Sequence, residues 1–147
     1  FFFVGLFVIV GALDESGFLK KMGDYFVGVT GGSIKKSVYV ILGVSAAASA
    51  AVDNIPFVAT MIPTLKAMEE ALGGREAMMP VWWALSLGAC LGGNGTLIGA
   101  SANVIVAGIA AREGHPISFL RFLIWSVPVM LLSVVVAGVF LYLEYFI

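Results

Sequence analysis

The sequence is poor in charge, cysteine and histidine. Only 12% of its 147 residues are charged, the net charge is −1, and there is one cysteine and one histidine. Cys90 alone allows no disulfide within the chain and is typical of a small buried apolar residue. The near-neutral charge gives no basic field for nucleic acid. No spacing typical of metal ligands, no phosphate loop and no Ser-His-Asp order is found, so nothing supports an enzyme.

The chain is instead rich in apolar residues. It is 61% hydrophobic, with a mean hydropathy of +1.06, whereas a soluble domain is about half apolar and about a quarter charged. We therefore predict an all-α, polytopic, integral membrane protein with the bilayer as its partner, in the plasma membrane or, in a bacterium, the inner membrane. The chain begins inside an apolar run, so we expect residues 1–147 to be one fragment of a larger transmembrane domain.

The pattern divides the chain into five segments. Residues 1–13 read as the end of a membrane helix, and residues 14–36 as a short interfacial helix and a loop. Residues 37–72 hold two half-length apolar runs, and residues 80–111 form a long apolar run with a break. Residues 118–146 are an ordinary membrane helix with aromatic residues near its ends.

Two of these segments are interrupted by polar clusters. The first cluster is Asp53-Asn54-Ile55-Pro56, and the second is Gly92-Gly93-Asn94-Gly95-Thr96. Such residues are costly at membrane depth unless they line a cavity or face buried protein. Paired interruptions of this kind indicate the binding site of a secondary transporter.

The first interruption fits two structures. A re-entrant hairpin is favoured because Pro56 disfavours α geometry at the residue before it, and because each run is too short to cross a core of about 30 Å. One long kinked helix is the alternative. In the second segment three glycines beside Asn94 predict an unwound stretch, since each costs about 1 kcal/mol relative to alanine in a helix.

Asp53 is the most informative candidate, because a carboxylate after so apolar a run needs a cation, a proton or a donor. It either binds a coupling Na⁺ or H⁺, or caps the helix that starts near Phe57. No other cofactor and no catalytic residue is expected. We predict an ion and substrate site at Ser49, Asp53, Asn54, Pro56, Gly93, Asn94, Gly95, Thr96, Ser101 and Asn103, with Na⁺ at Ser49, Asp53, Asn54 and Asn94. For the Ser and Thr residues, helix packing is an equally good explanation.

Residues 49–63, SAAVDNIPFVATMIP, and residues 88–103, GACLGGNGTLIGASAN, resemble the ArsB/NhaD group of the ion-transporter superfamily, which has a citrate-transporter-like domain. The closest likeness is to the branch of the melanosomal P protein and its bacterial relatives. The resemblance implies two inverted repeats, each with a re-entrant hairpin and a broken helix. This chain would be most of the C-terminal repeat, partnered by a missing N-terminal repeat and by a second copy in a homodimer.

The resemblance also implies roles for single residues. Asn54 matches an Asn that helps bind Na⁺, and Ser49 matches a Ser one turn earlier. Asp53 and Ile55 replace the Ser and Thr of relatives that carry dicarboxylates. The added charge would repel a carboxylate unless a cation intervenes.

Orientation stays open. In the hairpin arrangement six of the eight basic residues share one side, which the positive-inside rule places in the cytoplasm. The family's second hairpin enters from outside.

We therefore expect a secondary active transporter of ions or small anions, coupled to Na⁺ or H⁺ and working by alternating access. The alternatives are a Na⁺/H⁺ antiporter without organic substrate, an uncoupled anion pore, and a membrane scaffold, which leaves both polar breaks unexplained.

Overall fold

The computed structural model describes residues 1–147, apart from the side chains of Phe2, Phe3 and Leu6. No strand occurs along this described backbone, so the predicted all-α class is confirmed. The elements are α1 (Phe2–Glu15), α2 (Phe18–Thr30), α3 (Ile34–Ala51), α4 (Asn54–Glu69), α5 (Met79–Gly92), the 3₁₀ turn η1 (Gly93–Gly95), α6 (Ser101–Arg112) and α7 (Phe119–Phe146).

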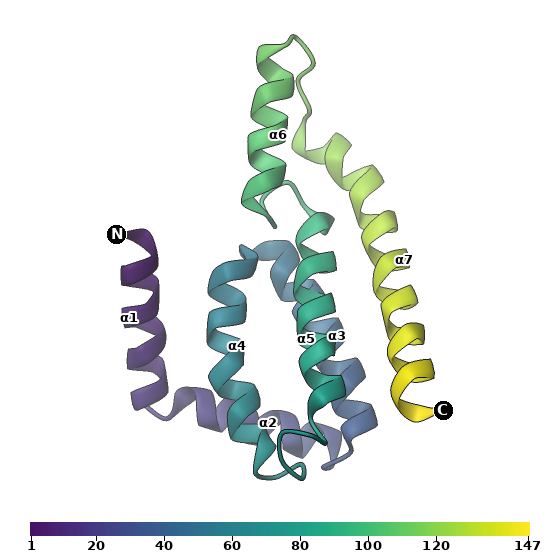
Figure 1. Ribbon diagram of the computed structural model, residues 1–147. Coiled ribbons are helices and arrows are strands. Elements are labelled where there is room, and N and C mark those ends of the chain that lie inside the picture. The colour runs from purple at the N-terminus through teal and green to yellow at the C-terminus, as the bar shows by residue number, and fades with distance from the viewer.

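Helix α2 lies across one end of the bundle, which we call the base (Figure 1). Its apolar face is buried, and Gly23 lies so close to α4 that a Cβ atom there would be 3.0 Å from Thr64 O. Gly17 and Gly31 bound the helix at φ 73° and φ 61°, where glycine is favoured. This is the stretch predicted to lie in the interface.

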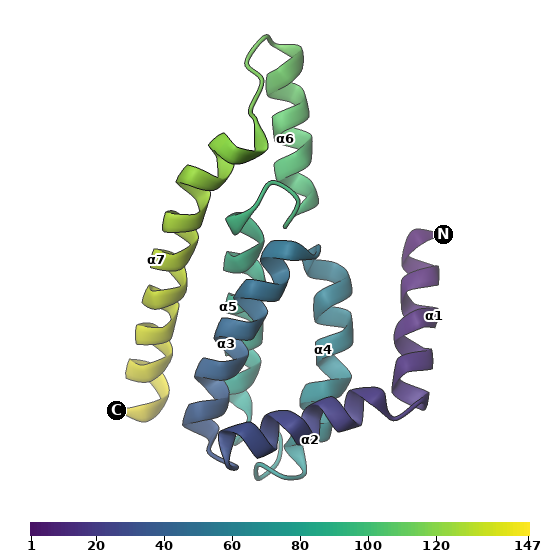
Figure 2. The same cartoon turned by 180° about the vertical axis from the view of Figure 1, so that it is seen from behind.

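Helices α3 and α4 run in opposite directions and are joined by a two-residue turn (Figure 2). Val52 and Asp53 are extended, with ψ 141° in both, and Asp53 begins α4 as its N-cap. The turn lies where the sequence predicted a break, and a single kinked helix is excluded.

Two details of this prediction were wrong. Helix α4 begins at Asn54 rather than near Phe57, with Pro56 as its third residue, because a first-turn residue needs no N–H for the helix ladder. Helix α3 has 18 residues and is longer than the half-length run that was predicted, because its first turn carries Lys35 and Lys36, which an apolar-run count leaves out. In the described chain α3 and α7 are the two helices long and apolar enough to cross a membrane.

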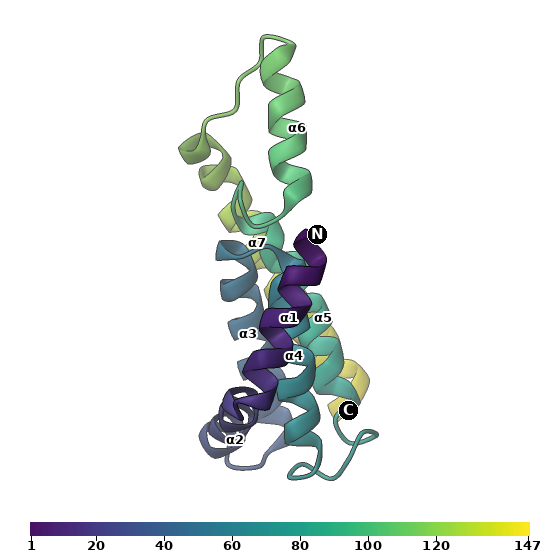
Figure 3. The ribbon, with the colours of Figure 1, turned by 90° about the vertical axis from the view of Figure 1, so that its left-hand side faces the viewer.

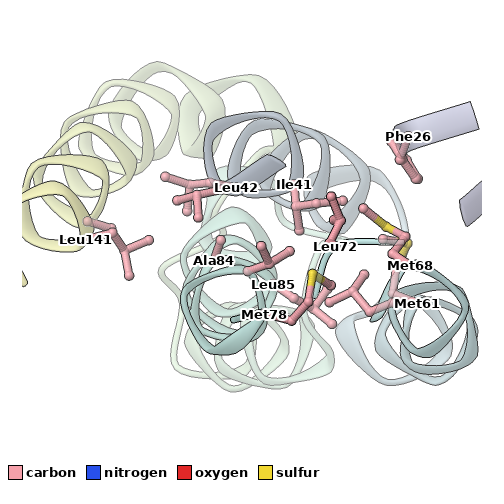
Figure 4. Packing of buried hydrophobic residues seen from close by; sticks show 14 residues of the cluster. Phe26, Ile41, Leu42, Met61, Met68, Leu72, Met78, Ala84, Leu85 and Leu141 are labelled. Atoms are coloured by element: carbon pink, nitrogen blue, oxygen red, sulfur yellow. The ribbon is translucent and has the colours of Figure 1, made fainter. Parts of the chain in front are cut away.

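Small residues hold α3 against α5. A Cβ atom on Gly88 would lie 2.7 Å from Leu42 O, and one on Gly92 would lie 2.5 Å from Ala46 Cα. Spacing glycines by four residues places both on one face, which lets two backbones touch. Below this contact, Leu42, Ala84 and Leu85 continue the buried core toward Met68 and Met78 (Figure 4).

Helix α6 continues beyond the body of the bundle, and α7 returns from its far end toward the base (Figure 3). Within the described part of the chain, no α6 residue is buried. Helix α7 also exposes large apolar side chains, such as Leu120 and Trp125. These surfaces suit lipid or another apolar partner better than water.

Candidate functional site

The two breaks meet. The turn between α3 and α4 lies beside the unwound segment between α5 and α6, in both the front and rear views (Figures 1 and 2). A Cβ atom on Gly93 would lie 2.6 Å from Asn54 Oδ1, and one on Gly99 would lie 3.0 Å from Ser49 O. Thr96 Oγ1 donates a hydrogen bond to Ala50 O. The polar clusters that are 40 residues apart in the sequence therefore form one site.

Ser49 links α3 to both neighbouring segments. Its hydroxyl is 2.7 Å from Ala89 O on α5 and also contacts Asn54 Oδ1 at the start of α4. A hydroxyl carries one proton for these two oxygens. One of the two oxygens therefore lacks a donor, unless the Asn54 amide is turned so that its NH₂ faces Ser49.

Asp53 has two roles at once. Its Oδ1 accepts a hydrogen bond from the Ile55 N–H at 3.2 Å, which caps α4, and its Oδ2 accepts one from the Ser101 hydroxyl at the start of α6. The carboxylate that caps α4 is thus the same one that contacts Ser101 of α6. It joins the N-termini of two short helices, where a negative charge is favoured.

Asn103 fixes the unwound segment from within α6. Its Nδ2 donates to Gly93 O and to Thr96 O, both at 3.0 Å. Backbone carbonyls without a helical partner need such donors when they are not in water. Asn103 therefore holds the loop in one shape instead of facing Asp53.

Asn94 and Pro56 do not join these contacts. Asn94 is exposed and, among the described residues, its side chain makes no hydrogen bond; it lines an open pocket of about 880 Å³ with His115 and Arg121. Pro56 lies half-buried in the first turn of α4. Of the four predicted Na⁺ ligands, Ser49 and Asn54 contact each other, whereas Asp53 bonds Ser101 and Asn94 lies on the α7 side of the break.

Sequence reasoning missed Ser126 and Met130 on α7. The Ser126 hydroxyl donates to Gly95 O at 2.7 Å, and a Cβ atom on Gly95 would lie 2.9 Å from Met130 Cε. Helix α7 therefore supports the unwound segment from the side opposite the hairpin. A serine within an apolar helix was the available signal, but such serines commonly bond their own helix, as Ser133 of the same helix does to Val129 O.

Four helix ends converge here. Helices α3 and α5 arrive with their C-termini, while α4 and α6 leave with their N-termini. Each end carries roughly half an elementary charge, negative at a C-terminus and positive at an N-terminus. Such a site can hold a cation on its carbonyl side and an anion on its N–H side. In the described chain no three His, Cys, Asp or Glu side chains gather as a metal site.

Comparison with known proteins decides the family. The family model described as citrate transporter matches residues 1–88. The chain belongs to the citrate transporter family. The family is one of membrane transporters rather than enzymes, as the sequence predicted.

Several relatives match nearly all of this chain. An uncharacterized transporter of Mycobacterium tuberculosis is 46% identical over 146 residues, which is 99% of this chain and 34% of the relative. One from Synechocystis is 39% identical over 153 residues, covering 95% of this chain and 34% of the relative. The mouse P protein is 43% identical over 141 residues, covering 90% and 16%.

The chain therefore spans about a third of the length of the bacterial relatives it matches. No solved structure matches it significantly. The predicted likeness to P protein and bacterial relatives is confirmed, and the family is confirmed at the level of the citrate transporters.

Proposed function

We propose that this chain forms half of the translocation site of a secondary active transporter of ions or small anions. The hairpin turn and the break between α5 and α6 bind a coupling cation and part of the substrate. The single observation that carries the proposal is the contact between the two interruptions through Asp53 and Ser101, and through Thr96 and Ala50 O. Membership of the citrate transporter family supports a transport function, and this contact supports the location of the binding site at the two interruptions.

Na⁺ suits the site better than a transition metal. The polar groups at the two breaks are the Asp53 carboxylate, the Ser49 hydroxyl, the Asn54 amide and backbone carbonyls, all of them hard oxygen ligands. A Cβ atom on Gly99 would lie 2.7 Å from Gly93 O and within 3.2 Å of two α3 carbonyls, so acceptors crowd one spot. Carbonyls of unwound segments and helix C-termini are the usual ligands of coupling ions in transporters.

The charge of Asp53 gives the cation a second purpose. Its carboxylate would repel an anionic substrate bound at the N-termini of α4 and α6. A cation between them removes the repulsion, which makes anion binding depend on the ion. This dependence is the physical basis of coupling, because each ligand then raises the affinity for the other by the same factor.

Alternating access would use α3 and α5 as one unit. Their backbones touch at Gly88 and Gly92, so the hairpin and the broken helix move together. We further propose that α3 and α4 enter the membrane as a re-entrant hairpin within a multi-pass protein of the ArsB/NhaD group. An N-terminal inverted repeat would then complete the site, with a homodimer as the assembly.

The test is transport by the full-length protein in proteoliposomes. Candidate anions (citrate, arsenite, chloride) are offered with an inward Na⁺ gradient, a choline gradient of equal size, or a pH gradient. Uptake that saturates and needs Na⁺ or H⁺ supports the proposal. Na⁺ efflux against H⁺ without any anion would make the protein an antiporter, and non-saturating flux without a gradient would make it a pore.

A further inference from the structure

A second polar hollow lies at the base, at the opposite end of α4 and α5 from the site. It has a volume of about 410 Å³ and is lined by Lys66 and Glu69 of α4, Arg75 of the connecting loop, and Met79 and Trp82 of α5. The ribbon shows this α4–α5 connection at the same end as α2 (Figure 2). Neither the family nor the proposed transport cycle assigns it a role.

The hollow carries both signs of charge. Glu69 Oε1 accepts a hydrogen bond from Trp82 Nε1 at 3.0 Å, which fixes the carboxylate on the α5 side. Among the described residues, neither Lys66 nor Arg75 is paired with a carboxylate. Arginine and lysine are the usual partners of phosphate, and a fixed carboxylate beside an indole suits an ammonium group.

The surrounding charge is slightly negative. Glu70 and Glu76 follow the lining residues Glu69 and Arg75 in the sequence and are exposed, so residues 66–76 hold more carboxylates than basic groups. A purely anionic ligand would gain little from such a neighbourhood, since its attraction to two cations is offset by three carboxylates. A ligand with one phosphate and one ammonium matches the lining.

The position of the hollow points to a lipid. Met79 and Trp83 at the start of α5 are each 49% exposed, so an apolar surface begins beside the polar hollow. Tryptophan gathers at membrane–water interfaces, where headgroups lie. Helix α2 crosses the same end with Phe18 and Tyr25 exposed, as a helix in the interface does.

We propose that this hollow binds the headgroup of a zwitterionic aminophospholipid. The phosphate lies between Lys66 and Arg75, the ammonium lies against Glu69, and the acyl chains follow the exposed face of α5 from Met79. Bound lipid would brace the α4–α5 connection at the end remote from the ion site.

The test uses the delipidated full-length protein and three lipids with equal acyl chains: phosphatidylethanolamine, phosphatidylcholine and phosphatidylglycerol. Native mass spectrometry counts retained lipid, and thermal unfolding measures the rise in midpoint that a native-state ligand causes. The variants are Lys66→Gln/Arg75→Gln and Glu69→Gln. The matched control is Lys20→Gln/Lys21→Gln, which removes two exposed lysines of α2 at the same end of the molecule.

We expect phosphatidylethanolamine to bind most tightly to the wild type and to the α2 control. The Lys66/Arg75 variant should lose about tenfold or more in affinity, because two charge-assisted contacts to the phosphate disappear. Glu69→Gln should bind phosphatidylethanolamine no better than phosphatidylcholine, since the ammonium loses its carboxylate. The midpoint without lipid shows that each variant is folded.

Three outcomes would overturn the proposal. One is equal retention of phosphatidylethanolamine by the wild type and the Lys66/Arg75 variant. Another is tighter binding of phosphatidylglycerol than of phosphatidylethanolamine by the wild type, which would show an anionic rather than a zwitterionic site. The last is a midpoint shift by soluble phosphoethanolamine as large as that by the lipid, which would show a site for a free solute.

Discussion

The close approach of α3 and α5 makes Gly92 the sharpest point at which to perturb the site. Its backbone is right-handed helical, with φ −61° and ψ −40°, so alanine is conformationally allowed there. An added Cβ atom, however, would collide with Ala46 O and lie 2.5 Å from Ala46 Cα and 2.7 Å from its carbonyl carbon. All of these are backbone atoms, which cannot rotate away. The helices must separate.

The magnitude follows from overpacking. Forcing an extra methyl group into a packed contact costs about 1–3 kcal/mol. Alanine for glycine inside a helix regains up to about 1 kcal/mol. Gly43 is the matched control, because it lies on α3 and a Cβ atom there would meet no atom within 4 Å. Gly43→Ala keeps the propensity gain without the collision, so the two variants should differ by about the collision cost.

Thermal unfolding of the purified full-length protein, in parallel with Na⁺-driven uptake, measures this difference. Gly92→Ala should lower the midpoint and reduce uptake, because Gly92 directly precedes the unwound segment and its displacement moves Gly93 away from Asn54. Gly43→Ala should leave both unchanged or raise the midpoint. Equal midpoints and equal uptake for the two variants would refute a backbone contact between α3 and α5 beside the site.

Three further predictions concern the unwound segment. Ser126→Ala should destabilise the protein by about 1 kcal/mol and weaken Na⁺ binding, because the Gly95 carbonyl loses its donor. The control Ser133→Ala, on the same helix, should leave Na⁺ binding unchanged. Equal Na⁺ affinities of the two variants would contradict the support of the unwound segment by α7. Asn103→Leu should lower Na⁺-driven uptake at least tenfold, since two loop carbonyls lose their donor; wild-type uptake in this variant would show that the loop keeps its shape without Asn103. Gly99→Ala should abolish the rise in midpoint with Na⁺, because its Cβ atom would meet three carbonyl oxygens, whereas Gly108→Ala on α6 should keep it; a preserved rise in both would place the cation elsewhere.

Much of the fold follows from local sequence. Three glycines beside Asn94 predicted the unwound stretch, and the polar cluster with Pro56 predicted the turn near Asp53, whereas the half-length argument fails for α3, which is long and apolar enough to cross a membrane. The errors at this turn arose because a proline is tolerated in a first helical turn and because two lysines at the start of α3 hid its true length. Boundaries depend on capping and first-turn chemistry, which an apolar count does not register.

The meeting of the two breaks could not be predicted from composition or spacing alone. It depends on the packing of α3 against α5 at Gly88 and Gly92, and the sequence marked Gly92 as part of the break rather than as a helix contact. For the same reason the sequence did not pair Ser126 with Gly95 O, a contact made through space. The sequence also did not predict which way the Asn94 side chain points, and it lies on the α7 side of the break.

The central claim is that the two breaks together hold a coupling cation, and the most direct test is thermal unfolding of the full-length protein in Na⁺ against choline. The wild type is compared with Asp53→Asn, since asparagine caps a helix about as well as aspartate and so isolates the charge. We predict a Na⁺-specific rise in the wild-type midpoint that disappears in Asp53→Asn. A wild-type midpoint that Na⁺ does not change, or a rise that survives in Asp53→Asn, would contradict a sodium site that depends on Asp53.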